Sequence, residues 1–327
     1  GKGAENGILI KNAESLEKLK DIDTVVMDKT GTITKGMPKV TDIVAFSTEV
    51  SKKELIQIAA SLEKKSEHPL AQAIVTEGEG KDVTLLKVLN FRAIEGVGVE
   101  GVIDKKMFTI RKPEERNVNE IIKQLQSDGK TVVLITSGKK ELGAIAISDT
   151  VKDSAKVAVR SLHNLGIRVI MLTGDNKLTG EYIAKQVGID TVIAGVLPQD
   201  KAKKIKELQE GGRKVAMAGD GINDAPALTQ ANVGIAMANG TDVAIESADV
   251  VLLHGDIDKI TNAIKLSKAT VRTIKQNLFW AFIYNIIGIP LAAGLLYPIS
   301  GILLNPVFAG LAMAGSSVSV VFNSLRL

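Results

Sequence analysis

Three short apolar runs in this sequence each end in an aspartate. They are Thr24–Asp28, Val169–Asp175 and Val215–Asp220. Continuous apolar strands that alternate with helices are typical of a parallel sheet covered on both faces, so these runs predict an α/β fold. Ligands of such sheets bind beyond the carboxyl ends of the strands. We therefore expect the three carboxylates, although distant in sequence, to converge at one edge of the sheet.

Further apolar patterns along the chain extend this α/β region, and one segment, residues 43–128, interrupts it. Further strands and helices of the region are predicted at Val132–Thr136, Ala144–Ser148, Val151–Leu165, Leu178–Val187, Asp200–Gln209, Val233–Met237 and Asp249–Leu253. Residues 43–128 instead hold a helix at Lys52–Lys64, a second helix begun by His68-Pro69, and glycine-rich short strands from Val88 to Ile110. They predict a small α+β domain inserted after the first strand, and inserted domains of this size commonly carry a substrate.

The C-terminal part lacks charge: no charged residue occurs from Gln276 to Leu325. One bilayer crossing needs about 20 apolar residues, so we place two membrane helices at residues 278–297 and 302–325. Basic residues flank the run, namely Lys265, Lys268, Arg272, Lys275 and Arg326. Positive flanks stay on the cytoplasmic side, so both ends are expected in the cytoplasm. A buried helical hairpin of a large soluble protein is the weaker alternative.

Composition argues against two classes of function. Net charge is only +4 and aromatic residues make up 3%, whereas nucleic-acid binding relies on basic patches interleaved with stacking rings. The absence of Cys excludes disulfides and cysteine-built metal sites within these residues. The sequence starts with Gly1 and shows no signal pattern, so we expect further protein upstream of it.

The heptapeptide Asp28-Lys29-Thr30-Gly31-Thr32-Ile33-Thr34 carries the strongest chemical signal. A carboxylate is ionised at neutral pH and can attack phosphorus to form an acyl phosphate. Because it must approach a polyphosphate, catalysis depends on positioning and charge neutralisation. Gly31 permits a tight turn whose amide groups can face a phosphate, and Thr30 and Thr32 add hydroxyl groups. A plain surface turn would explain a tripeptide, but not all seven residues.

This heptapeptide resembles the phosphorylation signature of the P-type ATPases. Residues 219–228, Gly-Asp-Gly-Ile-Asn-Asp-Ala-Pro-Ala-Leu, are similar to the family's hinge signature, and Thr173-Gly174-Asp175 to a third motif. The resemblance implies a haloacid-dehalogenase-like, Rossmann-type phosphorylation domain, an inserted nucleotide-binding domain and the last two membrane helices. The implied boundaries are 1–19 for a linker from a preceding membrane helix, 20–42 and 129–262 for the phosphorylation domain, 43–128 for the nucleotide-binding domain, and 263–327 for the membrane hairpin.

The resemblance also implies roles around Asp28, which would take a phosphoryl group from ATP. Asp28 and Asp220, with a backbone carbonyl near Thr30, are the expected ligands of Mg²⁺, a cation that prefers hard oxygens and relieves carboxylate repulsion. Lys201 would contact the phosphate and Thr173 would donate to it. The supporting residues are expected to be Lys29, Thr30, Thr32, Gly174, Asp175, Asn223 and Asp224. Without the resemblance, Gly-Asp-Gly would be an ordinary turn and Lys201 a solvated lysine.

The segment Ser66-Glu67-His68-Pro69-Leu70 resembles a motif of the heavy-metal-transporting branch. This implies that His68 helps to place the adenine of ATP, that Glu63 contacts its amino group, and that Gly96 and Gly98 let the backbone approach the nucleotide. One departure stands out. Where the family has a strand ending in Gly-Asn, this sequence reads Thr109-Ile110-Arg111-Lys112.

A second tripeptide is a false match. Thr179-Gly180-Glu181 spells the sequence with which these pumps hydrolyse the acyl phosphate, but that sequence belongs to a separate actuator domain. Here it falls on the helix after Asp175, so we interpret it as coincidence.

Polar residues within the charge-free run are candidates for ion binding. Tyr284 and Asn285 lie in the first predicted span, and Met313 and Ser317, four residues apart, lie in the second. A thioether is a soft ligand that suits Cu(I), and the four residues match the copper(I)-exporting subgroup. Helix packing by small and polar residues is the alternative. The subgroup's Cys-Pro-Cys ion site is expected upstream of Gly1.

These features predict the C-terminal portion of an ATP-driven Cu(I)-exporting pump that forms an aspartyl phosphate on Asp28. Expected partners are ATP, Mg²⁺, the soft metal ion, the lipid membrane, the pump's actuator and upstream membrane segments, and a metallochaperone. The expected location is the plasma membrane, with catalytic domains in the cytoplasm. The alternatives are a zinc or cadmium pump, a soluble phosphatase of the haloacid dehalogenase superfamily, and a nucleotide-binding fragment without turnover.

Overall fold

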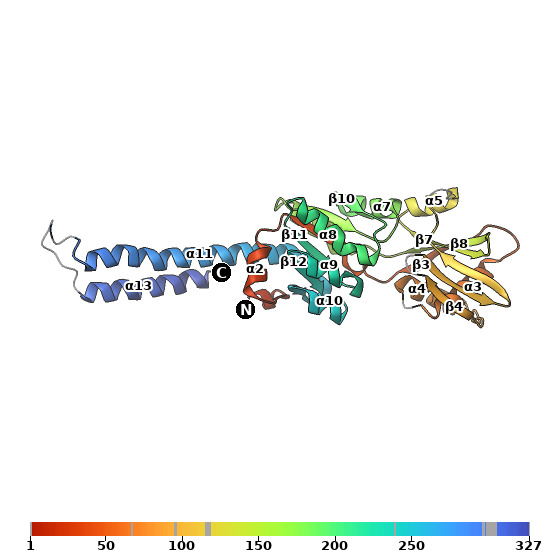
Figure 1. Cartoon of the computed structure of the whole chain (residues 1–327), viewed down its shortest axis with the longest axis horizontal. Coiled ribbons are helices and arrows are strands. Elements are labelled where there is room, and N and C mark those ends of the chain that lie inside the picture. The colour runs from red at the N-terminus through yellow and green to blue at the C-terminus, as the bar shows by residue number, and fades with distance from the viewer. Residues whose placement is uncertain are drawn as a thin grey trace. The chain divides into compact units, whose positions relative to one another are not determined.

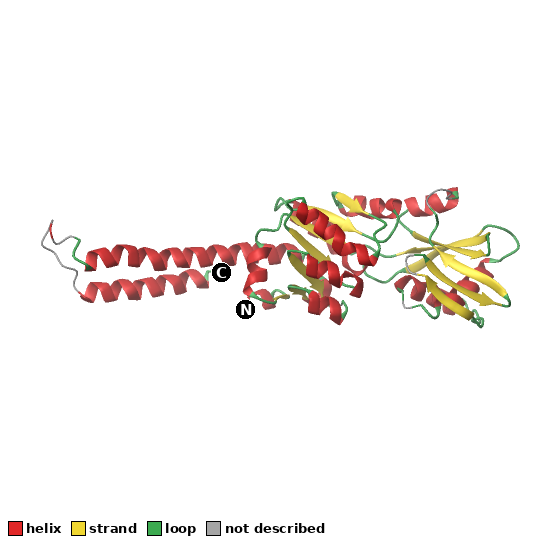
Figure 2. Cartoon of the chain, viewed as in Figure 1, coloured by secondary structure: helices red, strands yellow, loops and turns green. Residues whose placement is uncertain are grey.

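The computed structural model describes residues 2–66, 68–94, 97–114, 119–238, 240–295, 298 and 306–326. They fall into two units. The first contains residues 1–15 and 22–261, and the second contains residues 16–21 and 262–327. Within the described residues, strands occur only in the first unit, and the second unit is helical (Figures 1 and 2).

A seven-stranded sheet with the order β1-β13-β12-β11-β2-β9-β10 forms one half of the first unit. Its strands are β1 (Ile8–Ile10), β2 (Thr24–Asp28), β9 (Arg168–Leu172), β10 (Thr191–Ile193), β11 (Val215–Gly219), β12 (Val233–Met237) and β13 (Val250–Leu252). All neighbours are parallel except β1 and β13. Every residue of β2, β11 and β12 is buried, which explains why these strands read as unbroken apolar runs. The predicted α/β fold is confirmed.

Helices cover this sheet on both faces. Those of the first unit around the sheet are α1 (Lys2–Glu5), α6 (Asp153–His163), α7 (Lys177–Val187), α8 (Lys201–Glu210), α9 (Ala225–Gln230) and α10 (Asp242–Ser247). Ile205 of α8 and Leu228 of α9 pack with Val26 of β2 in one apolar cluster. Val25 and Met27, which point to the opposite face, are also fully buried. The three long helices predicted in this region are thus present, with ends shifted by one or two residues.

A six-stranded antiparallel sheet with the order β3-β8-β7-β6-β5-β4 forms the other half. Its strands are β3 (Lys39–Ala45), β4 (Leu89–Ile94), β5 (Gly98–Ile103), β6 (Lys106–Arg111), β7 (Thr131–Ser137) and β8 (Lys140–Ser148). The helices α3 (Lys52–Glu63) and α4 (Pro69–Gly80) pack on one face, and α5 (Glu120–Ser127) packs on the other. Both predicted helices and the short strands of the inserted domain are confirmed.

The assignment of two strands to the parallel sheet is wrong. Val132–Thr136 and Ala144–Ser148 lie in β7 and β8, which form an antiparallel hairpin of the six-stranded sheet. Both strands are buried on both faces, so their sequences show the continuous apolar pattern of parallel strands. The chain returns to the seven-stranded sheet only after Ser148, beyond the boundary predicted at residue 129.

The N-terminal segment is more than the predicted linker 1–19. Its apolar tripeptide Ile8-Leu9-Ile10 adds an antiparallel edge strand to the seven-stranded sheet, with Ile8 opposite Leu252 and Ile10 opposite Val250. Ile8 is only 2% exposed, so burial of its side chain accounts for the pairing. The helix α2 (Ala13–Leu19) follows, and its last four residues belong to the second unit.

The second unit contains most of α11 (Lys259–Ala292) and all of α13 (Pro306–Leu325), which lie side by side (Figure 1). Polar side chains join them: the Asn277 amide nitrogen donates to Ser324 Oγ over 2.8 Å, and that of Asn323 donates to Asn277 Oδ1 over 2.8 Å. Among the described residues, no helix combines the length and apolarity that a membrane crossing requires. The predicted spans, parts of which lie outside the described residues, therefore stay predictions.

Candidate active site

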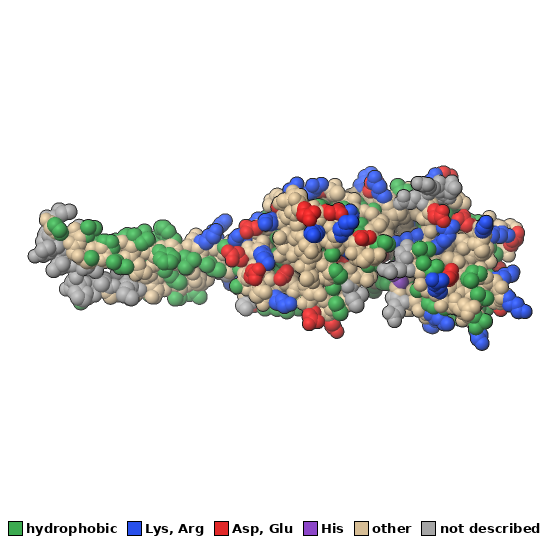
Figure 3. Space-filling view, in the orientation of Figure 1, with side chains coloured by type: hydrophobic (Ala, Val, Ile, Leu, Met, Phe, Trp, Pro, Cys, Tyr) green, Lys and Arg blue, Asp and Glu red, His purple; other side chains and the backbone are tan. Residues whose placement is uncertain are grey.

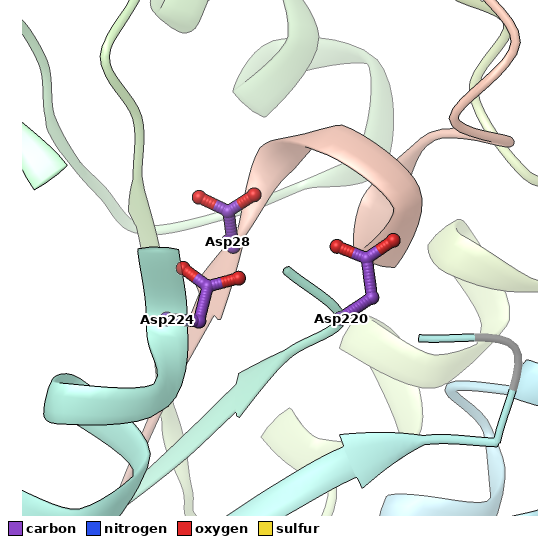
Figure 4. Close-up of side chains that lie close together, drawn as sticks. All are labelled: Asp28, Asp220 and Asp224. Carbon is purple, nitrogen blue, oxygen red and sulfur yellow. The ribbon is translucent and has the colours of Figure 1, made fainter. Parts of the chain in front are cut away.

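The carboxyl edge of the seven-stranded sheet gathers three aspartates (Figure 4). Asp28 ends the central strand β2, Asp220 directly follows the neighbouring strand β11, and Asp224 lies at the start of α9. Each offers a carboxylate oxygen such that these oxygens lie within 4.8 Å of one another. Asp28 and Asp220 converge as the strand pattern predicted. Asp224 joins them because the hinge segment turns back over the edge.

The turn Lys29–Ile33 holds the Asp28 carboxylate and brings Asp220 close. The backbone N–H of Thr30 donates to Asp28 Oδ2 over 3.0 Å. Gly31 has a φ of +72°, and a Cβ atom at this position would lie 1.6 Å from Asp220 Oδ2. A residue with a side chain would be strained by this positive φ and would push the Asp220 carboxylate aside. The turn and the approach of Asp220 therefore both favour the glycine in the signature.

Lys201 connects two of the carboxylates. Its Nζ atom donates to Asp28 Oδ1 over 2.7 Å and to Asp224 Oδ1 over 2.6 Å. The second oxygen of Asp224 accepts from the backbone N–H of Gly221 over 3.2 Å. Lys201, Asp28 and Asp224 are all buried, so these bonds hold the Lys201 ammonium between two carboxylates and fix the position of Asp28.

The cluster contains more negative charge than Lys201 alone can balance. Burial, and next the charge of Asp224, raise the pKa of Asp28 to about 7 against the opposing effect of Lys201. Burial and Asp224 likewise raise the pKa of Asp220 to about 6. Burial would lower the pKa of Lys201, but the charges of Asp28 and Asp224 outweigh it and raise that pKa. Extra positive charge at this edge would keep the carboxylates ionised.

A divalent cation fits this set of donors. Mg²⁺ prefers hard oxygen ligands, and three carboxylates converge here, two of them with raised pKa values. Lys201 bonds to one oxygen of Asp28 and one of Asp224, and a backbone N–H bonds to the second oxygen of each, so these hydrogen bonds do not single out two of the three carboxylates as ligands. Binding of Mg²⁺ by Asp28, Asp220 and the backbone near Thr30 stays a prediction.

The motif after β9 adjoins Asp28 through Lys29. Asp28 lies opposite Leu172 in the sheet, so Thr173 follows at the same edge. The Asp175 N–H donates to Thr173 Oγ1 over 3.1 Å, and the Asp175 carboxylate forms an ion pair with Lys29. Burial alone would raise the pKa of Asp175, but Lys29 outweighs it and lowers that pKa. Lys29 therefore ties two predicted motifs together.

Three further residues of the predicted site, Thr32, Asn223 and Gly174, differ in burial and in hydrogen bonding. The Thr32 hydroxyl is buried and has no hydrogen-bond partner among the described residues. Asn223 is exposed and precedes Asp224 in a short 3₁₀ turn. The backbone carbonyl of Gly174 accepts from Lys112 Nζ over 2.9 Å.

Two residues that were not predicted support the turn after Asp28. Asp149 accepts from Thr34 Oγ1 over 2.5 Å and from the Gly36 N–H over 3.1 Å. Lys152 Nζ donates to the carbonyl of Gly31 over 2.6 Å. Asp149 directly follows the apolar strand β8, so the pattern of a strand that ends in an acid could have found it. The pattern contains no comparable signal for Lys152.

The predicted nucleotide-binding residues lie around α3, α4 and the β5 strand. Glu63 ends α3 and is 8% exposed, and burial raises its pKa to about 7 against a hydrogen bond from Ser66. His68 caps α4, its Nδ1 accepting from the Leu70 N–H over 3.1 Å. Partial desolvation and then the charge of Lys112 lower the pKa of His68. A Cβ atom at Gly98 would lie 1.9 Å from the Ile110 carbonyl oxygen. Gly96 and Glu67 lie outside the described residues.

The segment that departs from the family pattern reaches the other sheet. Lys112 follows β6, its backbone N–H donates to the Val97 carbonyl over 3.2 Å, and its side chain binds Gly174. Arg111 instead pairs with Glu114 over 2.8 Å. Lys112 thus connects Val97, which precedes Gly98 and β5, with the Thr173-Gly174-Asp175 motif. The sequence did not indicate this contact.

The remaining predictions concern helices. Thr179-Gly180-Glu181 lies on α7, where Thr179 Oγ1 donates to the Lys130 carbonyl over 2.9 Å and Glu181 pairs with Lys177. In the second unit, the exposed Asn285 amide donates to the Ala281 carbonyl of its own helix over 2.9 Å. Tyr284 and Ser317 belong to the described helices, while the Met313 side chain lies outside the described part. Ion binding by these four residues stays a prediction.

Comparisons with known proteins show the family of the chain. The model of the haloacid dehalogenase-like hydrolases matches residues 22–232. The chain is 52% identical over its whole length to a probable copper-transporting ATPase of Synechococcus elongatus, of which it covers 45%. It is 50% identical to a copper-exporting P-type ATPase of Staphylococcus aureus and 48% identical to copper-transporting ATPase 2 of Rhizobium meliloti, and it covers 40% of each. The chain therefore spans less than half the length of these relatives.

Solved structures show the same likeness. A zinc-transporting PIB-type ATPase matches with a TM-score of 0.69 and 38% identity, over 99% of this chain and 53% of that one. The catalytic domain of a CPx-ATPase matches with a TM-score of 0.67 and 34% identity, over 81% of this chain and 97% of that one. The resemblance to heavy-metal P-type ATPases that the motifs predicted is confirmed.

Proposed function

The chain belongs to the haloacid dehalogenase-like hydrolases, and on this basis we propose that it is the phosphorylated, nucleotide-binding portion of an ATP-driven heavy-metal pump. The observation that carries this proposal is the placement of Asp28. It ends the central strand, receives the Lys201 ammonium, and lies beside a second carboxylate suited to a divalent cation. Similarity to copper-transporting ATPases over the whole of this chain, though over less than half of theirs, supports the same function.

The proposed reaction is transfer of the γ-phosphoryl group of ATP to Asp28. A carboxylate oxygen of Asp28 attacks the γ-phosphorus, the bond to the oxygen bridging to the β-phosphate breaks, and ADP leaves with that electron pair. Lys201 stabilises negative charge near the transferred group, and the Thr30 N–H holds the second Asp28 oxygen. Mg²⁺, held by Asp28, Asp220 and the Thr30 carbonyl, would neutralise charge on the phosphates when bound.

The nucleotide is proposed to bind at the six-stranded sheet, with adenine near Glu63 and His68 and the backbone of Gly98 alongside. The lowered pKa of His68 and its position as the cap of α4 support this site, because a neutral imidazole can lie against a base without charge. Gly96 would contribute to the same turn.

Labelling with γ-³²P-ATP tests the nucleophile. We expect acid-stable, hydroxylamine-labile label on the wild-type chain and none on Asp28→Asn, which lacks the attacking carboxylate. Asp104→Asn, a substitution of an exposed aspartate in the turn between β5 and β6, should label normally. Label that persists on Asp28→Asn would assign the reaction to another residue.

We further propose Cu(I) as the transported ion, bound with the help of Tyr284, Asn285, Met313 and Ser317 in a membrane hairpin formed by α11 and α13. The names of the relatives and the soft thioether of Met313 support copper. In this proposal the pump lies in the plasma membrane with the first unit in the cytoplasm. An actuator domain, upstream membrane segments and a metallochaperone complete its cycle.

A zinc pump is the second candidate, since the solved structure that matches over 99% of this chain is a zinc transporter. ATP hydrolysis by the complete pump that contains this chain separates the two: Cu(I) should stimulate it, and stimulation by Zn²⁺ alone would exclude copper. A phosphatase of the same fold would instead hydrolyse small phosphate esters without ATP or metal stimulation.

A further inference from the structure

A pocket of about 760 Å³ lies at one end of the helical hairpin, wholly within the second unit. It is lined by the turn after α2, the middle of α11 and the C-terminal end of α13. Its cationic residues are Lys20, Lys268, Arg272, Lys275 and Arg326. One acid, Asp21, also lines it and forms an ion pair with Lys20. The pocket is therefore strongly positive.

Four of these cations have no ion-pair partner among the residues that the structure describes: Lys268, Arg272, Lys275 and Arg326. The first three are spaced by four and three residues, so they lie on one face of α11. Like charges at this spacing repel one another and destabilise a helix. An anion bound in the pocket would relieve this repulsion.

The surface changes from charged to apolar directly beyond the pocket. Leu278, Phe282 and Ile286 of α11 are 51%, 61% and 65% exposed, and Phe322 of α13 is 66% exposed. Figure 3 shows hydrophobic side chains along these helices. Trp280, which lines the pocket, marks the change, and its ring meets Phe279 edge-on at 5.5 Å. Aromatic rings are enriched where a membrane protein passes from headgroups to acyl chains.

We propose that this pocket binds the phosphate headgroup of an anionic phospholipid, whose acyl chains lie along the exposed apolar side chains of α11 and α13. The inference rests on the proposed membrane hairpin. Basic clusters at the cytoplasmic end of membrane helices attract anionic lipids electrostatically. A free phosphate would meet the cations but leave the apolar rim in water. A phospholipid is complementary to both.

Trp280 makes the test direct, because it is the only tryptophan of the chain. The full chain in detergent micelles is titrated with phosphatidylglycerol or phosphatidylcholine, each brominated on its acyl chains, and quenching of tryptophan fluorescence is recorded. We expect phosphatidylglycerol to quench at roughly tenfold lower mole fraction, given the charge attraction of several cations. Because exposed charges are screened by salt, the preference should shrink in about 0.5 M NaCl, where the Debye length is about 4 Å.

Matched variants identify the cations responsible. Lys268→Gln/Arg272→Gln/Lys275→Gln should lose the preference for phosphatidylglycerol, and the single variant Lys268→Gln should weaken it. Lys139→Gln/Lys156→Gln/Lys185→Gln removes as many exposed charges from the first unit and should keep it. Circular dichroism establishes that each variant is folded. Equal quenching of the wild type by both lipids, or an unchanged preference in the pocket variant, overturns the proposal.

Two further measurements distinguish a lipid from a soluble anion, and the lipid site from the catalytic site. If inorganic phosphate at about 10 mM abolishes the lipid preference at constant ionic strength, the pocket binds a soluble anion and the lipid proposal is wrong. Phosphorylation of Asp28 is measured on the same samples. Normal labelling without a lipid preference refutes only the lipid site. A retained preference without labelling refutes only the proposed catalytic function.

Discussion

The two sheets of the first unit bury acidic side chains in opposite ways. At the edge of the seven-stranded sheet, buried carboxylates meet buried lysines: Lys201 binds Asp28 and Asp224, and Lys29 pairs with Asp175. Beside the six-stranded sheet, Glu63 is equally buried, but none of the described cations pairs with it and only the Ser66 hydroxyl bonds to its carboxylate.

This difference means that the carboxylates around Asp28 are held in one geometry, whereas Glu63 can change its protonation state. Paired charges in a buried network hold one geometry, which suits a nucleophile that must meet phosphorus in line. Asp28 has a similar pKa, but Lys201 and a bound divalent cation would keep it ionised, whereas Glu63 pairs with none of the described cations and is present in both protonation states near neutral pH. Glu63 can therefore donate as well as accept a hydrogen bond, which would suit the contact with a base proposed for it.

The largest effect is expected from Lys201→Met. It leaves Asp28 and Asp224 buried without their cation, which should lower the free energy of unfolding by about 3–5 kcal/mol at pH 8 and abolish labelling of Asp28. The loss should be smaller at pH 5, where the carboxyls can take up protons. Urea denaturation at the two pH values measures it. Lys203→Met, at an exposed position on the same helix, should change little, and a comparable loss there would refute the role of pairing.

Glu63→Gln should have the second largest effect, and of opposite sign. Because burial raises the pKa of Glu63 from 4.5 to about 7, its ionisation costs stability as the pH rises through this range. At pH 8 the Gln variant should be more stable than the wild type by up to about 3 kcal/mol, and at pH 4 the two should coincide. Thermal or urea unfolding across pH measures this difference. Substitution of the exposed Glu246 by Gln should leave the stability unchanged at both pH values. Equal stability of Glu63→Gln and the wild type at pH 8 would show that Glu63 is not desolvated.

The smallest effect on stability is expected from Lys112→Gln. This change removes the hydrogen bond from Lys112, which follows β6 of the six-stranded sheet, to Gly174 in the motif after β9 of the seven-stranded sheet. Lys112 is exposed, so its hydrogen bond to Gly174 should contribute less than about 1 kcal/mol to unfolding. The KM for ATP in the labelling reaction should nevertheless rise a few-fold, with the extent of labelling at saturating ATP unchanged. Lys87→Gln, an exposed change elsewhere in the same domain, provides the comparison. An unchanged KM would limit Lys112 to a surface contact.

Local patterns predicted the residues at the carboxyl edge because a parallel strand and the acid that follows it are adjacent in sequence. Asp28 and Asp220 needed only the rule that such ends share one edge. The rule failed for Val132–Thr136 and Ala144–Ser148, since burial on both faces erases the alternation that marks antiparallel strands. Lys152 and Lys112 escaped detection for another reason. Their contacts with Gly31 and Gly174 join residues 121 and 62 positions apart, and an isolated lysine gives no local sign of its partner.

The pairing of β1 with β13 has a mechanical consequence. Residues preceding Ile8 enter the sheet beside the point where the chain leaves it at Leu252, and the Leu253 N–H donates to the Gly7 carbonyl over 2.9 Å. Tension that separates these two chain segments would unzip a three-residue ladder one hydrogen bond at a time, at low force. Tension applied to both segments together would instead pull along the parallel strands of the seven-stranded sheet, where many interstrand hydrogen bonds would have to break at the same time. The edge strand thus ties the two segments together, and under tension that separates them we expect its short ladder to open before the parallel strands that hold the catalytic edge.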